Sequence, residues 1–108
     1  MLKLMQLSPR DPAMGMSRTI LAGAQMGLGQ YDDAIDQLHQ AIDSGYRSSY
    51  PYSQLAAAYA LNGKMDEAKA ALAEALKFSP DLSLKMLKQN NIFPIAIEGL
   101  RKAGLKEE

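Results

Sequence analysis

Few side chains in this sequence could carry out chemistry. His39 is the single histidine and there is no cysteine, so neither a thiolate site nor a multi-imidazole metal site can be built. A catalytic base also needs a partner and a pocket, and we interpret His39 as a solvated helix residue. Asp32, Asp33 and Asp36 gather three carboxylates, but a calcium site needs oxygen ligands that converge from a loop. Helix capping and a polar helix face explain these aspartates better. We therefore predict no catalytic residue, no metal site and no cofactor.

The composition predicts helices and excludes several function classes. The chain has 108 residues, with 12 basic and 12 acidic side chains and a formal net charge of zero, so it lacks the basic excess of a nucleic-acid-binding protein. No apolar run approaches the ~20 residues that cross a bilayer, and the first residues do not form a signal peptide. Valine and tryptophan are absent, whereas alanine, leucine and methionine are frequent, which favours helices over strands. We expect one all-α, soluble, cytoplasmic domain that binds neither nucleic acid nor membrane.

A repeat of 34 residues organises the predicted helices. Seven pairs of identical residues are separated by one repeat length. They are Leu21/Leu55, Ala22/Ala56, Gly29/Gly63, Asp32/Asp66, Ala34/Ala68, Leu38/Leu72 and Ala41/Ala75. Small side chains permit close approach of helix axes, and the leucines fill the space between helical hairpins. The glycines fall at the bends, where a positive φ favours glycine. The residues predicted to be buried are Ala22, Ala34, Leu38, Ala41, Leu55, Ala56, Tyr59, Ala68, Leu72 and Ala75.

The repeat gives a map of the single domain, residues 1–108. Helices are expected at about 13–28, 32–44, 49–61, 66–78, 82–89 and 94–103, and residues 1–7 read as the end of an earlier helix. We divide the domain into the tail of a preceding repeat, a first repeat, a second repeat and C-terminal capping helices, at residues 1–12, 13–46, 47–80 and 81–108.

This pattern resembles the tetratricopeptide repeat (TPR). The matching residues are Ala22, Gly29, Ala34, Leu38 and Ala41 in the first unit, and Ala56, Tyr59, Gly63, Ala68, Leu72, Ala75 and Pro80 in the second. Arg18 and Tyr46 depart from the pattern, because they replace a bulky apolar residue and the closing proline. The resemblance implies a TPR-type helical-hairpin solenoid with two full repeats plus flanking N-terminal and C-terminal helices. It also implies protein binding without catalysis.

The TPR resemblance assigns a groove that the first helix of each hairpin lines. The corresponding residues here are Met16, Thr19, Ile20, Gly23, Met26, Tyr50, Ser53, Gln54, Ala57 and Leu61. They include no lysine, arginine or asparagine, which one TPR class uses to grip a C-terminal carboxylate. An apolar groove suits an amphipathic helix, so a protein or peptide of that kind is the favoured partner.

Longer motifs resemble a narrower family. Four segments carry this second resemblance. In order along the chain they are LSPRDP at Leu7–Pro12, GQYDDAI at Gly29–Ile35, LAAAYALNGKMDEAKAAL at Leu55–Leu72 and EGLRKAGL at Glu98–Leu105. The series resembles the C-terminal TPR region of bacterial class III adenylate/guanylate cyclase-like proteins. It implies a scaffold or regulatory arm that follows a catalytic or signalling domain.

A self-association module with no separate partner is the alternative reading. Apolar residues at Leu2, Leu4, Met5 and Leu7 belong to a predicted helix whose own partner is missing. Exposed apolar surface of this kind usually marks an interaction site, and a symmetric dimer is its commonest outcome. We therefore expect homodimerisation through this segment and the first predicted helix. The rival expectation is that the segment folds back on its own first repeat, or frays, and leaves a monomer.

Overall fold

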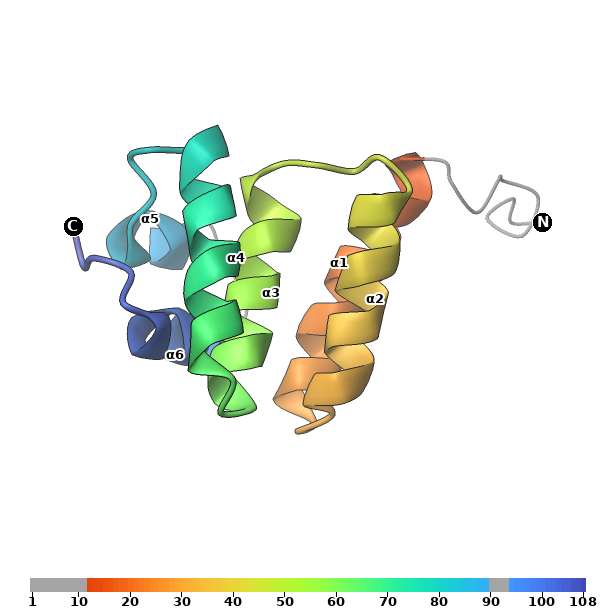
Figure 1. The fold of residues 1–108 in the computed structure, drawn as a ribbon, viewed down its shortest axis with the longest axis horizontal. Coiled ribbons are helices and arrows are strands. Elements are labelled where there is room, and N and C mark those ends of the chain that lie inside the picture. The colour runs from red at the N-terminus through yellow and green to blue at the C-terminus, as the bar shows by residue number, and fades with distance from the viewer. Residues whose placement is uncertain (1–11, 90–93) are drawn as a thin grey trace.

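The computed structural model describes residues 12–89 and 94–108, which form six α-helices and no strand (Figure 1). In chain order these are α1 (Pro12–Gly27), α2 (Tyr31–Asp43), α3 (Ser49–Leu61), α4 (Met65–Phe78), α5 (Leu84–Gln89) and α6 (Pro94–Ala103). The predicted all-α class is confirmed. The largest difference from the expected bounds is at the start of α5, two residues later than predicted. The helix predicted at residues 1–7 lies outside the described residues.

Two helical hairpins, α1–α2 and α3–α4, stand next to each other (Figure 1). Gly29 and Gly63 make the bends of the two hairpins with φ values of 79° and 80°, as the repeat predicts. The second hairpin meets the first mainly where α3 packs against α2. Each helix therefore buries its apolar side against a neighbour, which is what stabilises a solenoid of short helices.

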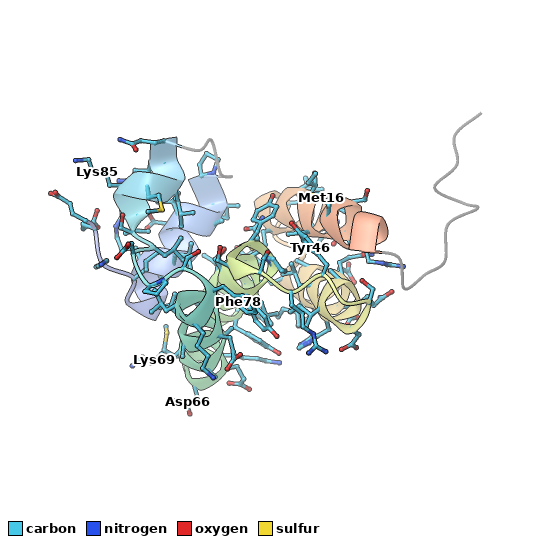
Figure 2. All side chains as sticks on the ribbon, turned by 90° about the horizontal axis from the view of Figure 1, so that it is seen from above. Met16, Tyr46, Asp66, Lys69, Phe78 and Lys85 are labelled. Atoms are coloured by element: carbon cyan, nitrogen blue, oxygen red, sulfur yellow. The ribbon has the colours of Figure 1, made fainter. Side chains whose placement is uncertain are left out.

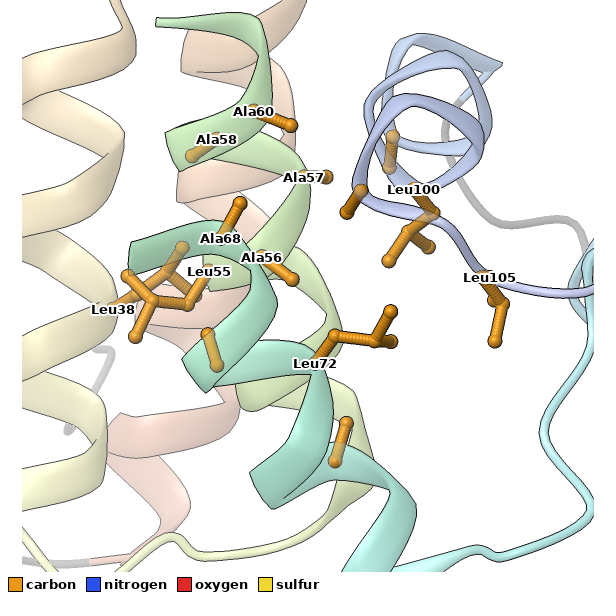
Figure 3. Packing of buried hydrophobic residues seen from close by; sticks show 14 of the residues in the cluster. Leu38, Leu55, Ala56, Ala57, Ala58, Ala60, Ala68, Leu72, Leu100 and Leu105 are labelled. Atoms are coloured by element: carbon orange, nitrogen blue, oxygen red, sulfur yellow. The ribbon is translucent and has the colours of Figure 1, made fainter. Parts of the chain in front are cut away.

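The core follows the 34-residue register. Nine of the ten residues predicted to be buried are buried, and Leu38 and Leu72 fill the space between small alanines (Figure 3). Tyr59 is the exception, because it is only partly buried at the edge of the core. Its hydroxyl oxygen lies 2.9 Å from His39 Nε2, so the polar tip of the tyrosine reaches a partner near the surface.

The aspartates at the start of α2 do not cap the helix as predicted. The N-cap residue is Gln30, with no side-chain cap hydrogen bond, and Asp32 and Asp33 lie inside the first turn. There their negative charge complements the positive end of the helix dipole. Asp32 Oδ1 instead accepts a hydrogen bond of 3.0 Å from Asn62 Nδ2, which joins the two hairpins.

The last helix, α6, crosses back over the second hairpin. It packs mainly against α3 and also contacts α1 and α4. Its buried residues are Ala96, Ile97, Gly99, Leu100 and Ala103. Because the first helix of each hairpin carries the predicted groove, the position of α6 bears directly on the candidate site.

Candidate functional site

The structure divides the predicted groove into a covered part and an open part. The buried groove residues are Thr19, Gly23, Met26, Ser53, Gln54 and Ala57. Tyr50 and Leu61 are partly buried. Met16 and Ile20 on α1 are exposed, with 44% and 49% of their surface accessible. The predicted groove residues that remain exposed are therefore on α1, not on α3.

The chain's own helix α6 covers the α3 part of the groove. A β-carbon on Gly99 would lie 2.6 Å from the backbone oxygen of Ala57 and 2.8 Å from its Cα, so the two backbones touch. Ala57 and Leu100 face each other across this contact (Figure 3). An amphipathic helix, the kind of ligand predicted for the groove, thus occupies it from within the same chain. Sequence reasoning missed this, although a glycine inside a helical pattern often marks a close packing contact.

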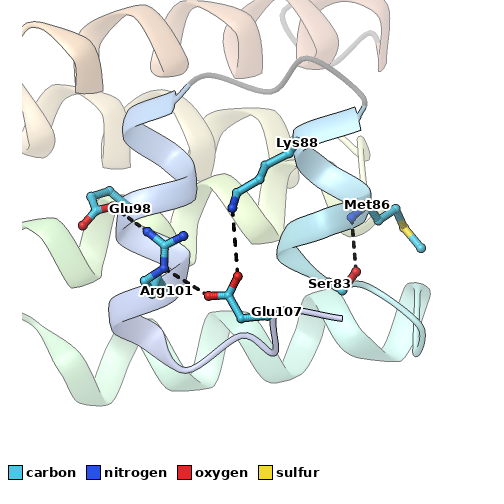
Figure 4. Close-up of polar contacts among 6 residues, drawn as sticks. All are labelled: Ser83, Met86, Lys88, Glu98, Arg101 and Glu107. Atoms are coloured by element: carbon cyan, nitrogen blue, oxygen red, sulfur yellow. Dashed lines mark hydrogen bonds and ion pairs between the residues drawn. The ribbon is translucent and has the colours of Figure 1, made fainter.

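The C-terminal residues tie α6 to α5. The backbone N–H groups of Leu84 and Lys85 donate to the carbonyl oxygens of Lys106 and Glu107, both at 2.9 Å. These donors belong to the first turn of α5, which has no partner for them within the helix. The Glu107 carboxylate also lies 3.2 Å from Arg101 Nε and 4.0 Å from Lys88 Nζ (Figure 4). The ion pairs are exposed and contribute little, so the backbone bonds define the position of this tail.

The exposed part of the predicted groove is apolar. Met16 lies beside Tyr46, whose hydroxyl is 3.5 Å from the methionine sulfur (Figure 2). Tyr46 itself packs so closely on α1 that a β-carbon on Gly15 would collide with it. The residue that replaces the expected proline therefore has a packing role against α1. Arg18 is the one charged residue in the α1 sequence, and the exposed Met16 and Ile20 present a surface without charge.

The polar groups of the covered part do not form a catalytic arrangement. Gln54 is buried, and within residues 12–89 and 94–108 neither polar atom of its amide has a hydrogen-bond partner. Burial raises the pKa of the Tyr50 phenol above its ordinary value, so this group stays neutral at physiological pH. Residues 12–89 and 94–108 contain no group of three or more side chains able to hold a metal ion. None of their helices is long and apolar enough to span a membrane.

Comparison with protein families matches one repeat. The model described as a tetratricopeptide repeat matches residues 50–82, which comprise most of α3, all of α4 and the turn that follows. Comparisons with curated proteins and with solved structures found no match. TPR repeats generally mediate protein–protein interaction. The protein is thus an all-α, TPR-like helical solenoid that contains a tetratricopeptide repeat at residues 50–82.

Proposed function

We propose that this chain is a non-catalytic interaction module whose groove holds an amphipathic helix. The observation that carries the proposal is the seating of α6 on α3, where Gly99 lies directly on the Ala57 backbone. A glycine at the crossing point and apolar residues on both sides of it are what a helix needs to enter such a groove. The absence of lysine and arginine among the predicted groove residues argues against recognition of a C-terminal carboxylate.

The open α1 strip extends this surface for a separate partner. Met16 and Ile20 lie one helical turn apart, and Tyr50 adds a neutral polar contact at the partly buried edge. A partner helix with apolar side chains at matching spacing would bury these residues without placing a charge against a like charge. Exposed methionine adapts its shape to different side chains, which suits a surface of this kind.

The groove should accept a helix supplied in trans once α6 is displaced. In a Gly99→Leu variant the larger side chain cannot fit against Ala57, so we expect a labelled peptide of residues 94–108 with the wild-type sequence to bind saturably. The wild-type protein should not bind it at micromolar concentration, because tethered α6 competes at an effective concentration of order millimolar. Fluorescence anisotropy of the labelled peptide measures its binding to the variant and to the wild-type protein. The matched control is the same peptide with Ile97→Glu and Leu100→Glu, and circular dichroism verifies that the variant remains helical. No binding to a folded Gly99→Leu variant would contradict the proposal.

The resemblance of several motifs to those of cyclase-like proteins is the basis for proposing a specific context for the module. We infer that it acts in the bacterial cytoplasm as the regulatory or assembly arm of a class III cyclase-like signalling protein. The LSPRDP and EGLRKAGL segments carry this resemblance, and in the sequence they come before and after the hairpins, at Leu7–Pro12 and Glu98–Leu105. In this role the module would position a signalling domain by binding other protein surfaces.

The isolated chain should not convert ATP or GTP to a cyclic nucleotide. Its sequence contains no glycine-rich phosphate loop, and the metal-binding aspartate pair of a class III cyclase has no counterpart in it. Chromatographic detection of the cyclic nucleotide, with magnesium or manganese present, measures this. Turnover that disappears on substitution of a residue within this chain would show the module to be catalytic after all.

Self-association remains the second candidate function. The residues first proposed for it, Leu2, Leu4, Met5 and Leu7, lie outside the described residues. The observation that favours self-association is on and just after α1, where Leu21 and Leu28 are exposed in addition to Met16 and Ile20. These two leucines are distinct from the predicted groove residues Met16 and Ile20.

A further inference from the structure

An apolar cavity lies between α4 and the residues that follow α6. Its volume is about 280 Å³, and residues 104–106 line one side of it. The other side is lined by Leu72, Leu76, Pro80 and Leu82, which we call the α4 pocket. These residues belong to α4 and to the connection between α4 and α5, on the side of the second hairpin opposite the first hairpin (Figure 1).

The end of α6 turns the chain so that Leu105 enters this cavity. Gly104 has a φ of 105°, and its N–H donates to the Arg101 carbonyl oxygen at 3.1 Å. The Leu105 N–H donates to the Leu100 carbonyl oxygen at 3.0 Å. These two hydrogen bonds define a Schellman cap, in which the residue after the glycine packs back on the helix. Leu105 is consequently buried, whereas its neighbours Gly104 and Lys106 are exposed.

Leu105 does not fill the space that it enters. The cavity is the volume left open beside the Leu105 side chain, which lies near Leu72 of α4 (Figure 3). The gain from transferring apolar surface out of water is proportional to the area that is buried. A side chain larger than leucine, delivered to the same place, should therefore bind the α4 pocket more strongly than the chain's own tail does.

We propose that the α4 pocket is a second anchoring site for the partner helix, in addition to the groove on α3. The inference rests on the proposed function, in which a helix supplied in trans replaces α6. The occupant is an amphipathic helix with a small residue facing Ala57 and a glycine as its C-terminal cap. A bulky apolar residue, phenylalanine or tryptophan, comes directly after that glycine. The cap residue is glycine because few other residues adopt a φ near the 105° of Gly104.

Two anchors fix the direction of the bound helix. Gly99 lies on the Ala57 backbone, and Leu105 enters the α4 pocket six residues further along the chain. A helix bound in the opposite direction would place its N-terminus at this pocket, where the Schellman turn that delivers the side chain cannot form. The second anchor also bears on displacement of α6, because tethering favours the chain's own helix. A larger side chain in the pocket gives the partner affinity that the tail lacks.

Leu105→Phe in the full chain tests whether the pocket has room for a larger side chain. We expect a thermal midpoint equal to or above that of the wild type, because the ring enters open volume. The matched control is Leu100→Phe, which adds the same ring where the side chain is fully buried. Overpacking should lower the midpoint of this control by at least about 5 °C. A Leu105→Phe midpoint below that of the wild type overturns the proposal.

Binding of labelled peptides of residues 94–108 tests the pocket as an anchor for a partner. The host is the full chain with Gly99→Leu and Leu105→Asp, which keep its own helix and tail out of the two sites. The Leu105→Phe peptide should bind about 3- to 10-fold more tightly than the natural peptide, and the Leu105→Ala peptide at least about 10-fold more weakly. The control peptide carries Lys102→Phe, which places the ring at an exposed position of α6 and should bind as the natural peptide does.

The pattern of affinities separates this inference from the proposed function. If none of the peptides binds a host that circular dichroism shows to be folded, the proposed function fails and the anchoring site fails with it. If the natural, Leu105→Phe and Leu105→Ala peptides bind equally, the groove on α3 accepts a helix but the α4 pocket does not anchor it. That outcome overturns this inference alone. A second host with Gly99→Ala in place of Gly99→Leu makes a smaller change at the crossing, should the first not fold.

Leu76→Asp in the host locates the anchor. A carboxylate in the α4 pocket should remove the difference in affinity between the Leu105→Phe and Leu105→Ala peptides, because neither side chain gains from a polar wall. The binding that both peptides share through the groove on α3 should remain. A difference that persists at its full size in the Leu76→Asp host would place the residue after the cap outside the α4 pocket, and this overturns the proposal.

Discussion

Replacing Gly99 with alanine should destabilise the protein, although the same change stabilises most helices. Alanine has a helix propensity about 1 kcal/mol better than glycine, so an unhindered helical glycine gains stability on substitution. At Gly99 the added β-carbon would lie 2.6 Å from the backbone oxygen of Ala57, and a backbone atom cannot rotate away. We expect α6 to be displaced from α3, with a net loss of about 1–3 kcal/mol in the free energy of unfolding. Urea denaturation followed by circular dichroism measures the loss.

Gly27→Ala is the matched control for this substitution. Gly27 is also a helical residue, the last one of α1, but a β-carbon added there would meet no neighbouring atom within 4 Å. We expect this variant to be unchanged or more stable by up to about 1 kcal/mol. Gly99→Ala should therefore lower the free energy of unfolding, whereas Gly27→Ala should leave it unchanged or raise it. A Gly99→Ala protein at least as stable as the wild type would mean that α6 does not lie on the Ala57 backbone.

The sequence was sufficient to predict the hairpins because their signals repeat. Each pair such as Ala22 and Ala56, or Leu38 and Leu72, marks a close helix contact twice, and the bend glycines confirm the register independently. Helix bounds then follow from where the apolar periodicity starts and stops. The same logic identifies which side of each of the four hairpin helices is apolar, and this is why the predicted core agrees with the structure except at Tyr59.

Periodicity in the sequence cannot predict which helix will pack against an apolar helix face. Thr19, Met26 and Gln54 were assigned to a groove open to a partner, and all three are buried in the folded chain. The assignment of the face was sound, but α6 does not repeat with the 34-residue period, so no register related it to α3. Only Gly99 hinted at a close crossing, and a single glycine does not identify the helix that it touches. Arg18 and Gln25 present the same difficulty for prediction. A polar residue at a repeat position that is usually apolar does not indicate which group will form a hydrogen bond with it.

Leu55→Ala should cost far more stability than Leu21→Ala, although the two residues occupy the same place in consecutive repeats. Leu55 is buried where α3 packs against α2, and we expect its truncation to lower the free energy of unfolding by about 2–4 kcal/mol. Leu21 is 45% exposed, so its truncation should cost less than about 1 kcal/mol in dilute protein. Both variants make the same chemical change within a helix, so propensity cancels in the comparison. Thermal or urea unfolding at low micromolar concentration gives the two values.

The difference between these variants measures what stacking one hairpin on another contributes. Leu55 has a hairpin against it and Leu21 does not, and the described residues give no other reason for their burial to differ. Equal losses would mean that the hairpins are stable individually and that the solenoid contact is incidental. The comparison also responds to concentration, because a partner that binds only the folded state adds to apparent stability. If α1 pairs with a second copy, the cost of Leu21→Ala should rise toward that of Leu55→Ala as the protein concentration increases, while the cost of Leu55→Ala should stay nearly constant.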